Sequence, residues 1–276
     1  KAEKTNELVH RLAYHSSRSG DTNLAKRHLL AAGFGAIKRG VYKEAERYFT
    51  ECVAFADEDK TDPLYVRAAV ALAEMYSRYG LTLVEDPASA GASGSVRIVA
   101  MLRSLLAAQL PPGASLDSLD QDELTEKMIT PQTMLNMSHV CHSLAWALSN
   151  DGIGETSQLS VENYFNHAFR MRTAAGQPLL AAESLAGLGT YFHGVGLSHV
   201  AVDPLRANEY YERATVLLAR SLQLRAADPR YEWSVELASS LTALGVLQRD
   251  KGGHDTLLAV DTCFWAFERY SATLGT

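Results

Sequence analysis

The chain has 276 residues and a formal net charge of −6, and 47% of its residues are hydrophobic against 21% charged. This balance excludes the low hydrophobicity and high charge of disordered chains. Arginine and lysine are scattered among acidic residues, so no basic stripe is present that would follow the phosphates of a nucleic acid or an anionic membrane.

Helical periodicity begins at once in the first 80 residues, where apolar side chains recur every three or four positions. Gly40 and Gly80 are typical of helix C-terminal ends, and Pro63 is typical of a first helical position. The connections between these segments are short, so neighbouring helices must be antiparallel. The predicted helices cover residues 4–19, 22–39, 42–57 and 63–79.

The segment from Val84 to Gly94 is rich in Ala, Gly and Ser and predicts a loop. A helix at 96–110 should end at Pro111-Pro112-Gly113, since proline cannot continue it. A second loop follows, with a short helical piece at 121–128. Further helices are predicted at 133–150, 160–175, 178–195, 203–227, 231–251 and 255–274, and strand-like alternation is absent from the sequence.

The three cysteines, Cys52, Cys141 and Cys263, lie far apart within apolar helical patterns, which favours reduced thiols and a cytoplasmic location. No apolar run approaches the roughly 18 residues of a membrane-spanning helix, and the first ten residues lack a signal-peptide core. Because the chain starts at Lys1 without an initiator Met, we interpret it as a segment of a longer protein.

Small residues recur where two antiparallel helices must nearly touch, and large residues recur where the space against the next helix must be filled. The first copy of this pattern consists of Leu29, Ala32, Gly33, Ala36, Gly40, Tyr42, Ala45, Phe49, Cys52 and Pro63. Its spacing is close to that of the tetratricopeptide repeat. Four more copies follow, each with extra residues in the turn between its two helices.

These copies predict an all-α fold, an α-solenoid of tetratricopeptide-like antiparallel helical hairpins. We expect one superhelical domain over residues 1–276, with sub-blocks 1–80 and 132–276 joined by a loop-rich region, 81–131. Glycine at a helix contact allows two axes to come closer than the usual distance of about 8–10 Å. The residues assigned to packing within and between repeats are Gly33, Ala45, Phe49, Ala73, Ala145, Phe165, Gly189, Tyr211, Gly245 and Ala259.

Two parts of the sequence also resemble particular families. Residues 7–15, 19–21, 24–33 and 40–45 resemble the opening of the tetratricopeptide region behind the NTPase module of soluble-type adenylyl cyclases and related signal-transduction ATPases. Residues 236–247 and 273–276 are similar to the longer repeat of kinesin light chains and nephrocystin-3, although Gln248 replaces the expected aromatic residue. Both resemblances imply a scaffold or regulatory arm of a larger signalling or transport protein.

No residue pattern points to catalysis, a cofactor or a metal, because GxxxxGK[ST] and Gly-x-Ser-x-Gly motifs are absent. An acidic group at residues 57–62 lacks the spacing of a calcium loop and is interpreted as a solvated turn. Two histidine groups have neither CxxC nor HExxH beside them, so a structural role is favoured over a zinc site. These groups are His139 with Cys141 and His142, and His193 with His199.

Candidate partner-binding residues are of two kinds. Basic residues could capture a phosphopeptide or a C-terminal carboxylate on the inner face of the repeats, although solvated helix faces explain them equally well. Two aromatic residues near the end of the chain would be left uncovered unless a further repeat or a partner packs on them, so we expect the chain to self-associate there. The candidates are Lys38, Arg39, Arg67, Arg78, Trp265 and Phe267.

The sequence therefore predicts a non-catalytic protein–protein interaction scaffold that is part of a larger protein or assembly. The expected partners are other proteins, with no nucleic acid, membrane, metal or cofactor. The location is cytoplasmic, and a cytoskeletal or ciliary assembly is the narrower expectation. The alternative is a regulatory C-terminal arm of a multidomain adenylyl cyclase or signal-transduction NTPase, which an NTPase signature upstream of Lys1 would support.

Overall fold

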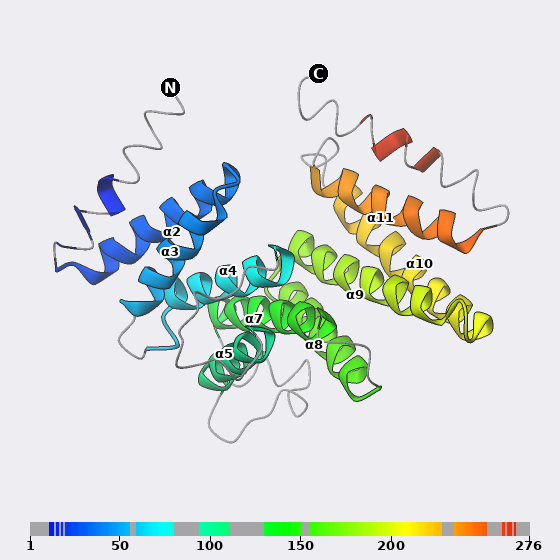
Figure 1. Cartoon of the computed structure of the whole chain (residues 1–276), viewed down its shortest axis with the longest axis horizontal. Coiled ribbons are helices and arrows are strands. Elements are labelled where there is room, and N and C mark those ends of the chain that lie inside the picture. The colour runs from blue at the N-terminus through cyan, green and yellow to red at the C-terminus, as the bar shows by residue number, and fades with distance from the viewer. Residues whose placement is uncertain are drawn as a thin grey trace. The chain divides into compact units, whose positions relative to one another are not determined.

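A computed structural model of the chain is all-helical over the residues it describes, with no β-strand among them (Figure 1). None of the helices in this described part is long and apolar enough to cross a membrane. The described residues are 11–13, 15–16, 18, 20–55, 59–79, 94–110, 130–150, 155–227, 235–252, 261–262, 264–266 and 268. Residues 84–93 of the predicted loop and the helical piece at 121–128 fall outside them, as do most residues of the predicted first and last helices; Gly94, predicted as loop, is the first residue of a helix.

The chain divides into two compact units, which are described separately. Unit 1 comprises residues 1–123 and 135–151, and unit 2 comprises residues 124–134 and 152–276. The helices that lie mainly in unit 1 are α2 (Thr22–Lys38), α3 (Tyr42–Ala54), α4 (Pro63–Tyr79), α5 (Gly94–Gln109) and α7 (Pro131–Asn150). Those of unit 2 are α8 (Glu155–Ala174), α9 (Pro178–His199), α10 (Pro204–Ala226) and α11 (Val235–Lys251).

Consecutive helices pack on one another in each unit: α2 on α3, α3 on α4 and α4 on α5 in unit 1, and α8 on α9, α9 on α10 and α10 on α11 in unit 2. In addition, α2 contacts α4 and α9 contacts α11, so alternate helices also lie against each other. This arrangement is that of stacked tetratricopeptide-like hairpins, in which the first helices of successive repeats are neighbours.

Local signals at the ends of α2 explain why this helix has the predicted length. The carboxylate of Asp21 accepts a hydrogen bond from the backbone N–H of Leu24 at 3.0 Å, which satisfies one of the free donors of the first turn. After the helix, Gly40 adopts φ +74°, and the N–H of Val41 donates to the carbonyl of Ala36. Only glycine adopts this left-handed conformation without strain, so α2 ends here.

In unit 2 the boundaries that differ most from the prediction among the described residues are the start of α8 and the end of α9, and the first four residues of the predicted helix at 231–251 lie outside the described residues. Helix α8 begins at Glu155, five residues before the predicted start. The sequence prediction missed this first turn because its Glu-Thr-Ser-Gln sequence carries no apolar residue that would extend the periodicity. Helix α9 continues past Val195 to His199. The predicted stop is wrong because Gly196 remains within the helix and provides a close contact to the ring of Tyr211.

The hairpin of α2 and α3 is built around a glycine in unit 1. A Cβ atom on Gly33 would overlap the ring of Phe49, which is fully buried and packs edge-on against Phe34 with ring centroids 5.1 Å apart. Ala45 and Ala73 are also fully buried. Small side chains on one helix therefore make the space that an aromatic side chain on the other fills.

Unit 2 uses the same kind of contact three times along α9. A Cβ atom would lie 2.6 Å from Cε1 of Phe165 at Gly187, 2.9 Å from Cγ of Leu218 at Gly189, and 2.6 Å from Cε1 of Tyr211 at Gly196. Real Cβ atoms do not approach other carbons so closely, so these three positions accept only glycine at the present helix separation. The three glycine contacts are Gly187 with Phe165, Gly189 with Leu218, and Gly196 with Tyr211.

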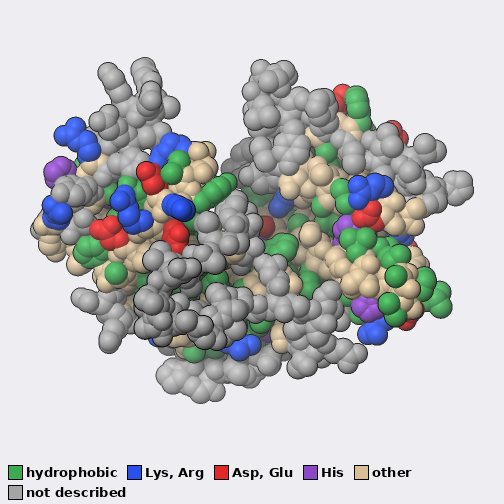
Figure 2. All heavy atoms as spheres, viewed as in Figure 1, with side chains coloured by type: hydrophobic (Ala, Val, Ile, Leu, Met, Phe, Trp, Pro, Cys, Tyr) green, Lys and Arg blue, Asp and Glu red, His purple; other side chains and the backbone are tan. Residues whose placement is uncertain are grey.

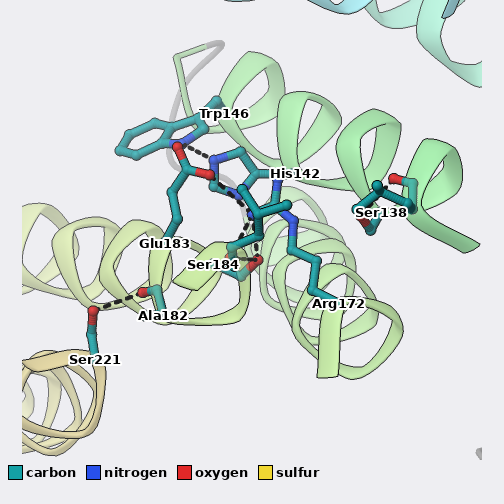
Figure 3. A network of polar contacts seen from close by, with 10 residues as sticks. Ser138, His142, Trp146, Arg172, Ala182, Glu183, Ser184 and Ser221 are labelled. Atoms are coloured by element: carbon teal, nitrogen blue, oxygen red, sulfur yellow. Dashed lines mark hydrogen bonds and ion pairs between the residues drawn. The ribbon is translucent and has the colours of Figure 1, made fainter. Parts of the chain in front are cut away.

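Buried polar groups connect successive hairpins of unit 2 (Figure 3). The guanidinium of Arg172 at the end of α8 donates to Ser184 Oγ at 2.9 Å and to the carbonyl of Leu180 at 2.8 Å, both on α9. In the same way, Arg225 at the end of α10 donates to Ser240 Oγ on α11 at 2.7 Å. The end of each second helix is thus tied to the start of the next first helix.

In unit 1 an ion pair connects the first helix of one hairpin, α2, to the start of the next first helix, α4. The ammonium of Lys26 on α2 lies 2.6 Å from the carboxylate of Asp62, and the Lys26 and Asp62 side chains are 9% and 16% exposed. Asp62 also accepts from the backbone N–H of Leu64 and so caps α4. The predicted solvated turn is therefore wrong for Asp62, whereas Asp59 is exposed and accepts from the hydroxyl and N–H of Thr61.

Candidate functional site

Two surfaces made by neighbouring first helices are the candidate binding sites, one in each unit. On α2, the exposed side chains that form such a surface recur at intervals of four, three and four residues, which places them on one side of the helix; we call them the exposed stripe of α2. The α2–α4 face consists of Arg27, Ala31, Phe34 and Lys38 on α2 and Arg67 on α4. The α9–α11 face consists of Ala186, Thr190, His193, Gly194 and Leu197 on α9 and Thr242, Val246, Arg249 and Asp250 on α11.

The centre of the α2–α4 face is an aromatic ring under a cation. Phe34 is half-buried, and the guanidinium carbon of Arg67 lies 5.3 Å from its ring centroid. Arg67 comes from the next first helix, so this contact joins α2 to α4. A guanidinium at this distance over a ring is attracted to its π face and is held there while its outer N–H groups stay in water.

The basic residues near this face fall into two groups by their charge partners; all except Arg27 were candidates from the sequence. Arg39 follows the end of α2 and lies 3.4 Å from Glu44, so its charge is partly balanced. Lys38 is exposed in the last turn of α2, and Arg27 is exposed three turns before it. Within the described residues, Arg27, Lys38 and Arg67 pair with no carboxylate. The α2–α4 face therefore carries three cations, one of which lies over an aromatic ring.

The α9–α11 face has a different centre, in which charges compensate one another. Nε2 of His193 lies 2.9 Å from Oδ2 of Asp250. The other carboxylate oxygen, Oδ1, accepts from Nε of Arg249 at 2.8 Å and lies 2.7 Å from a terminal guanidinium nitrogen of the same residue. Asp250 thus links α9 to α11, and both oxygens of its carboxylate have a partner.

The surroundings of this centre are small and uncharged. Ala186, Thr190 and Gly194 follow one another along the open side of α9, and a Cβ atom on Gly194 would meet nothing within 4 Å. The hydroxyl of Thr242 donates to the carbonyl of Ala238 within its own helix. This face therefore offers space for a backbone but little charge to select a ligand.

Tyr211 lies beneath the α9–α11 face and has an unusual environment. The centroid of its ring lies 5.9 Å from the ring centroid of His193. The residue is only 5% exposed, and its hydroxyl has no hydrogen-bond partner among the described residues. Burial, with a smaller contribution from the nearby Asp250 carboxylate, raises the pKa of Tyr211 above its ordinary value. Its role is packing against Gly196, and the phenol stays neutral.

The remaining predicted site residues are distributed as follows. Arg78 is in α4, but its side chain lies outside the described residues, as do Phe267 and Ala259. Trp265 is 60% exposed. The other assigned packing residues are buried: Gly33, Ala45, Phe49, Ala73, Ala145, Phe165, Gly189, Tyr211 and Gly245.

The histidine groups have local partners. On α7, Nε1–H of Trp146 donates to Nε2 of His142 at 3.3 Å, a bond drawn in Figure 3. On α9, Nδ1 of His199 lies 2.9 Å from the carbonyl of Val195. In the part of the chain that the structure describes, no group of three or more His, Cys, Asp and Glu side chains is arranged to hold a metal ion.

Sequence reasoning missed two features of these faces. It treated Phe34 as an ordinary residue of α2, although its spacing from Ala31 and Lys38 places it on the exposed stripe. It also grouped His193 with His199, whereas the partner of His193 is Asp250, 57 residues away. No local pattern identifies such a distant pair, although the two residues hold nearby positions in successive repeats.

Comparison with known proteins locates the chain at the level of fold. No family model matches the sequence, and no curated protein matches it. Among solved structures, the crystal structure of BtubC (BKLC) from P. vanneervenii is similar over 100% of this chain and 90% of that chain, with a TM-score of 0.57 and 17% sequence identity. Together with the all-helical model, this likeness supports the predicted all-α helical-repeat fold of tetratricopeptide type.

Proposed function

We propose that the chain is a non-catalytic protein-interaction scaffold and that unit 1 binds an acidic segment of a partner protein on the α2–α4 face. The observation that carries this proposal is the position of Arg67 over the ring of Phe34, beside the exposed Lys38. The face offers apolar contact and positive charge together. An extended peptide with an apolar side chain between carboxylates matches both.

Charge supports unit 1 over unit 2 as the main binding site. The whole chain carries a net charge of −6, so an acidic partner is repelled by most of its surface. The three cations of the α2–α4 face, which pair with no carboxylate in the described part of the chain, give such a partner one local attraction. On the α9–α11 face, by contrast, Arg249 is already paired with Asp250.

A peptide-binding measurement tests the proposal. The probe is a fluorescein-labelled nonapeptide of alternating Glu and Leu, and the control probe replaces every Glu with Lys. Fluorescence anisotropy should show binding of the acidic probe that weakens as salt is added, since exposed charges are screened over about 10 Å at 0.1 M salt. The Lys probe should not bind.

Matched variants locate the site. The double variant Lys38→Glu/Arg67→Glu should weaken binding of the acidic probe by at least about tenfold, which corresponds to about 1.4 kcal/mol. Arg103→Glu reverses an exposed charge on α5, away from the face, and should change the affinity little. Equal losses in the two variants, or binding of both probes alike, would remove the support for this face.

Identity of the natural partner follows from affinity capture with the wild-type chain and the Lys38→Glu/Arg67→Glu variant, compared by mass spectrometry. A protein recovered by the wild type alone is a candidate partner. We place the scaffold in the cytoplasm, and the similarity of residues 236–247 to kinesin light chain repeats makes a cytoskeletal or ciliary assembly the narrower proposal.

A further inference from the structure

The charges on the exposed stripe of α2 are spaced unevenly around its aromatic ring. Arg27 lies seven residues before Phe34, and Lys38 lies four residues after it. With a rise of about 1.5 Å per residue, these intervals correspond to about 10.5 Å and about 6 Å along the helix axis. Arg67 is at the level of the ring, because its guanidinium lies over it. Two cations therefore lie at the ring or one turn after it, and Arg27 lies farther away on the other side.

Arg27 was not among the residues expected from the sequence, but its surroundings suit a contact with a ligand. Its side chain is exposed and pairs with no carboxylate among the described residues. The neighbouring Lys26 already holds Asp62. Acidic side chains appear beside basic ones at the left of Figure 2, yet α2 itself contains no Asp or Glu from Thr22 to Lys38. A carboxylate supplied by a ligand would therefore meet Arg27 without competition from within α2.

The opposite end of the α2–α4 face carries a negative residue. The next charged residue along α4 after Arg67 is Glu74, seven positions later and hence on the same side of the helix. Because α2 and α4 are the first helices of successive hairpins, they run in the same direction, so Glu74 lies beyond the level of Lys38. A ligand carboxylate past Lys38 would approach a negative residue instead of a further cation. Negative groups of a ligand are therefore favoured on both sides of the ring rather than together on this one.

This spacing selects a pattern of residues in an extended ligand, in which side chains on one side recur every two residues, about 6.6 Å apart. When an apolar side chain packs on Phe34, a carboxylate two residues away reaches the level of Lys38. A carboxylate four residues away in the other direction falls about 3 Å past Arg27, whose long stem spans that difference. We propose that Arg27 determines specificity by selecting acidic segments with carboxylates four residues to one side of an apolar residue and two residues to the other. This inference rests on the proposed function, because it describes the same ligand.

Titration of the isotope-labelled full chain with serine-based peptides, followed by NMR so that weak binding is measured, tests the proposal. The flanking probe carries one Leu with a Glu four residues to one side and a Glu two residues to the other. The clustered probe carries both Glu residues on the same side of the Leu, two and four residues away, so the two probes have the same composition and net charge. Each probe is made in both sequence orders, because the structure does not fix the direction of the peptide.

The wild type should bind the better flanking probe about threefold more tightly than the better clustered probe, a difference of the size expected from one exposed ion pair. Arg27→Ser should remove this preference. Arg27→Glu should bind a flanking probe whose distant Glu is replaced with Lys at least about threefold more tightly than the wild type binds it. Arg103→Glu reverses an exposed charge on α5 and should keep the wild-type preference. Arg27 and Arg103 are both exposed, so the thermal unfolding midpoints should stay close to that of the wild type.

The outcomes separate this inference from the proposed function. Equal binding of the flanking and clustered probes by the wild type, or a preference that survives in Arg27→Ser, would overturn the role of Arg27 and leave the acidic ligand of the face in place. Loss of the preference in Arg103→Glu would overturn it too, since net charge would then be the cause. If the nonapeptide of alternating Glu and Leu does not bind the wild type, the proposed function fails and this inference fails with it.

Discussion

In unit 1 the hairpin glycine, Gly33, lies beneath the ring of Phe49, and in unit 2 Gly196 lies beneath the ring of Tyr211 in the same way. The side chains exposed beside these contacts are nevertheless unlike. On the α2–α4 face three cations have no carboxylate partner among the described residues, whereas around His193 the charges of Asp250 and Arg249 are paired. Residues that pack the repeat and residues that select a ligand are thus separate sets, and the second can change while the first stays.

The units also differ in how successive hairpins are joined. Unit 1 uses the ion pair of Lys26 and Asp62. In unit 2, Arg172 and Arg225 donate hydrogen bonds to serines, and Arg172 also forms an ion pair with Glu183, a carboxylate that is more exposed than Asp62. A lysine ammonium is a compact charge that requires an opposite charge when buried, whereas a guanidinium can spread its donors over several neutral acceptors. The join in unit 1 should therefore be the more sensitive to loss of one partner.

Removing the carboxylate in unit 1 should have the largest effect. Asp62→Ala leaves the Lys26 ammonium buried without its partner and removes the cap of α4, so we expect a loss of about 3 kcal/mol in the free energy of unfolding by urea. Asp62→Asn keeps the cap and should lose less. Glu44→Ala, which removes the exposed pair with Arg39, should change stability by less than about 1 kcal/mol. A similar loss for Glu44→Ala would contradict the distinction between the two pairs.

Overpacking the shared glycine contact should cost nearly as much in either unit. Gly33→Leu and Gly196→Leu force a side chain into the ring of Phe49 or Tyr211, and each should lower stability by about 1 to 3 kcal/mol. Gly189→Leu and Gly245→Leu are expected to behave in the same way.

Gly194→Ala is the matched control on α9, because a Cβ atom there meets nothing. It should raise stability by up to about 1 kcal/mol, the difference in helix propensity between alanine and glycine. If Gly196→Leu shifted the urea midpoint no more than Gly194→Ala does, close packing would not explain the glycine.

Weakening a serine join in unit 2 should have a smaller effect than losing Asp62. Ser184→Ala removes one acceptor from Arg172, whose guanidinium still donates to the carbonyl of Leu180, so we expect a loss of about 1 to 2 kcal/mol. Ser240→Ala should act similarly through Arg225. Hydrogen exchange of α9 and α11 amides measures both, and a loss larger than that of Asp62→Ala would reverse the ranking of the two joins.

The smallest expected change is a gain from Tyr211→Phe. This substitution removes a buried hydroxyl that has no hydrogen-bond partner among the described residues, so stability at pH 7 should be unchanged or rise by up to about 1 kcal/mol. The raised pKa of Tyr211 adds a pH dependence: its neutral form is favoured in the folded chain, so stability is complete below the ordinary pKa of 10.0 and falls as the pH rises above it.

Urea midpoints at pH 8 and pH 10.5 separate the two contributions. The advantage of Tyr211→Phe over the wild type should be larger at pH 10.5, because phenylalanine does not ionise. An equal advantage at the two pH values would show that the phenol ionises as readily in the folded chain as in the unfolded one, and would contradict the raised pKa.

Sequence alone determined the helical architecture, because the period of the apolar residues and the small residues at hairpin contacts are local patterns. It located α2 and α4 to within a residue, since Asp21, Gly40 and Pro63 are end signals that act on their own neighbours. The sequence prediction ended α9 too early. Glycine occurs both within helices and just after helix ends, and the sequence alone does not distinguish the two cases. Only the contact of Gly196 with Tyr211 distinguishes them.

The tertiary structure alone decided which polar residues act together. Lys38 and Arg67 were candidates from the sequence, but the ring of Phe34 between the two helices is what gives them a common surface. Asp62 and His193 found partners 36 and 57 residues away. Such pairs depend on how far one helix turns about the next, and that rotation is fixed by the packing of the whole repeat rather than by the residues on either side of the charge.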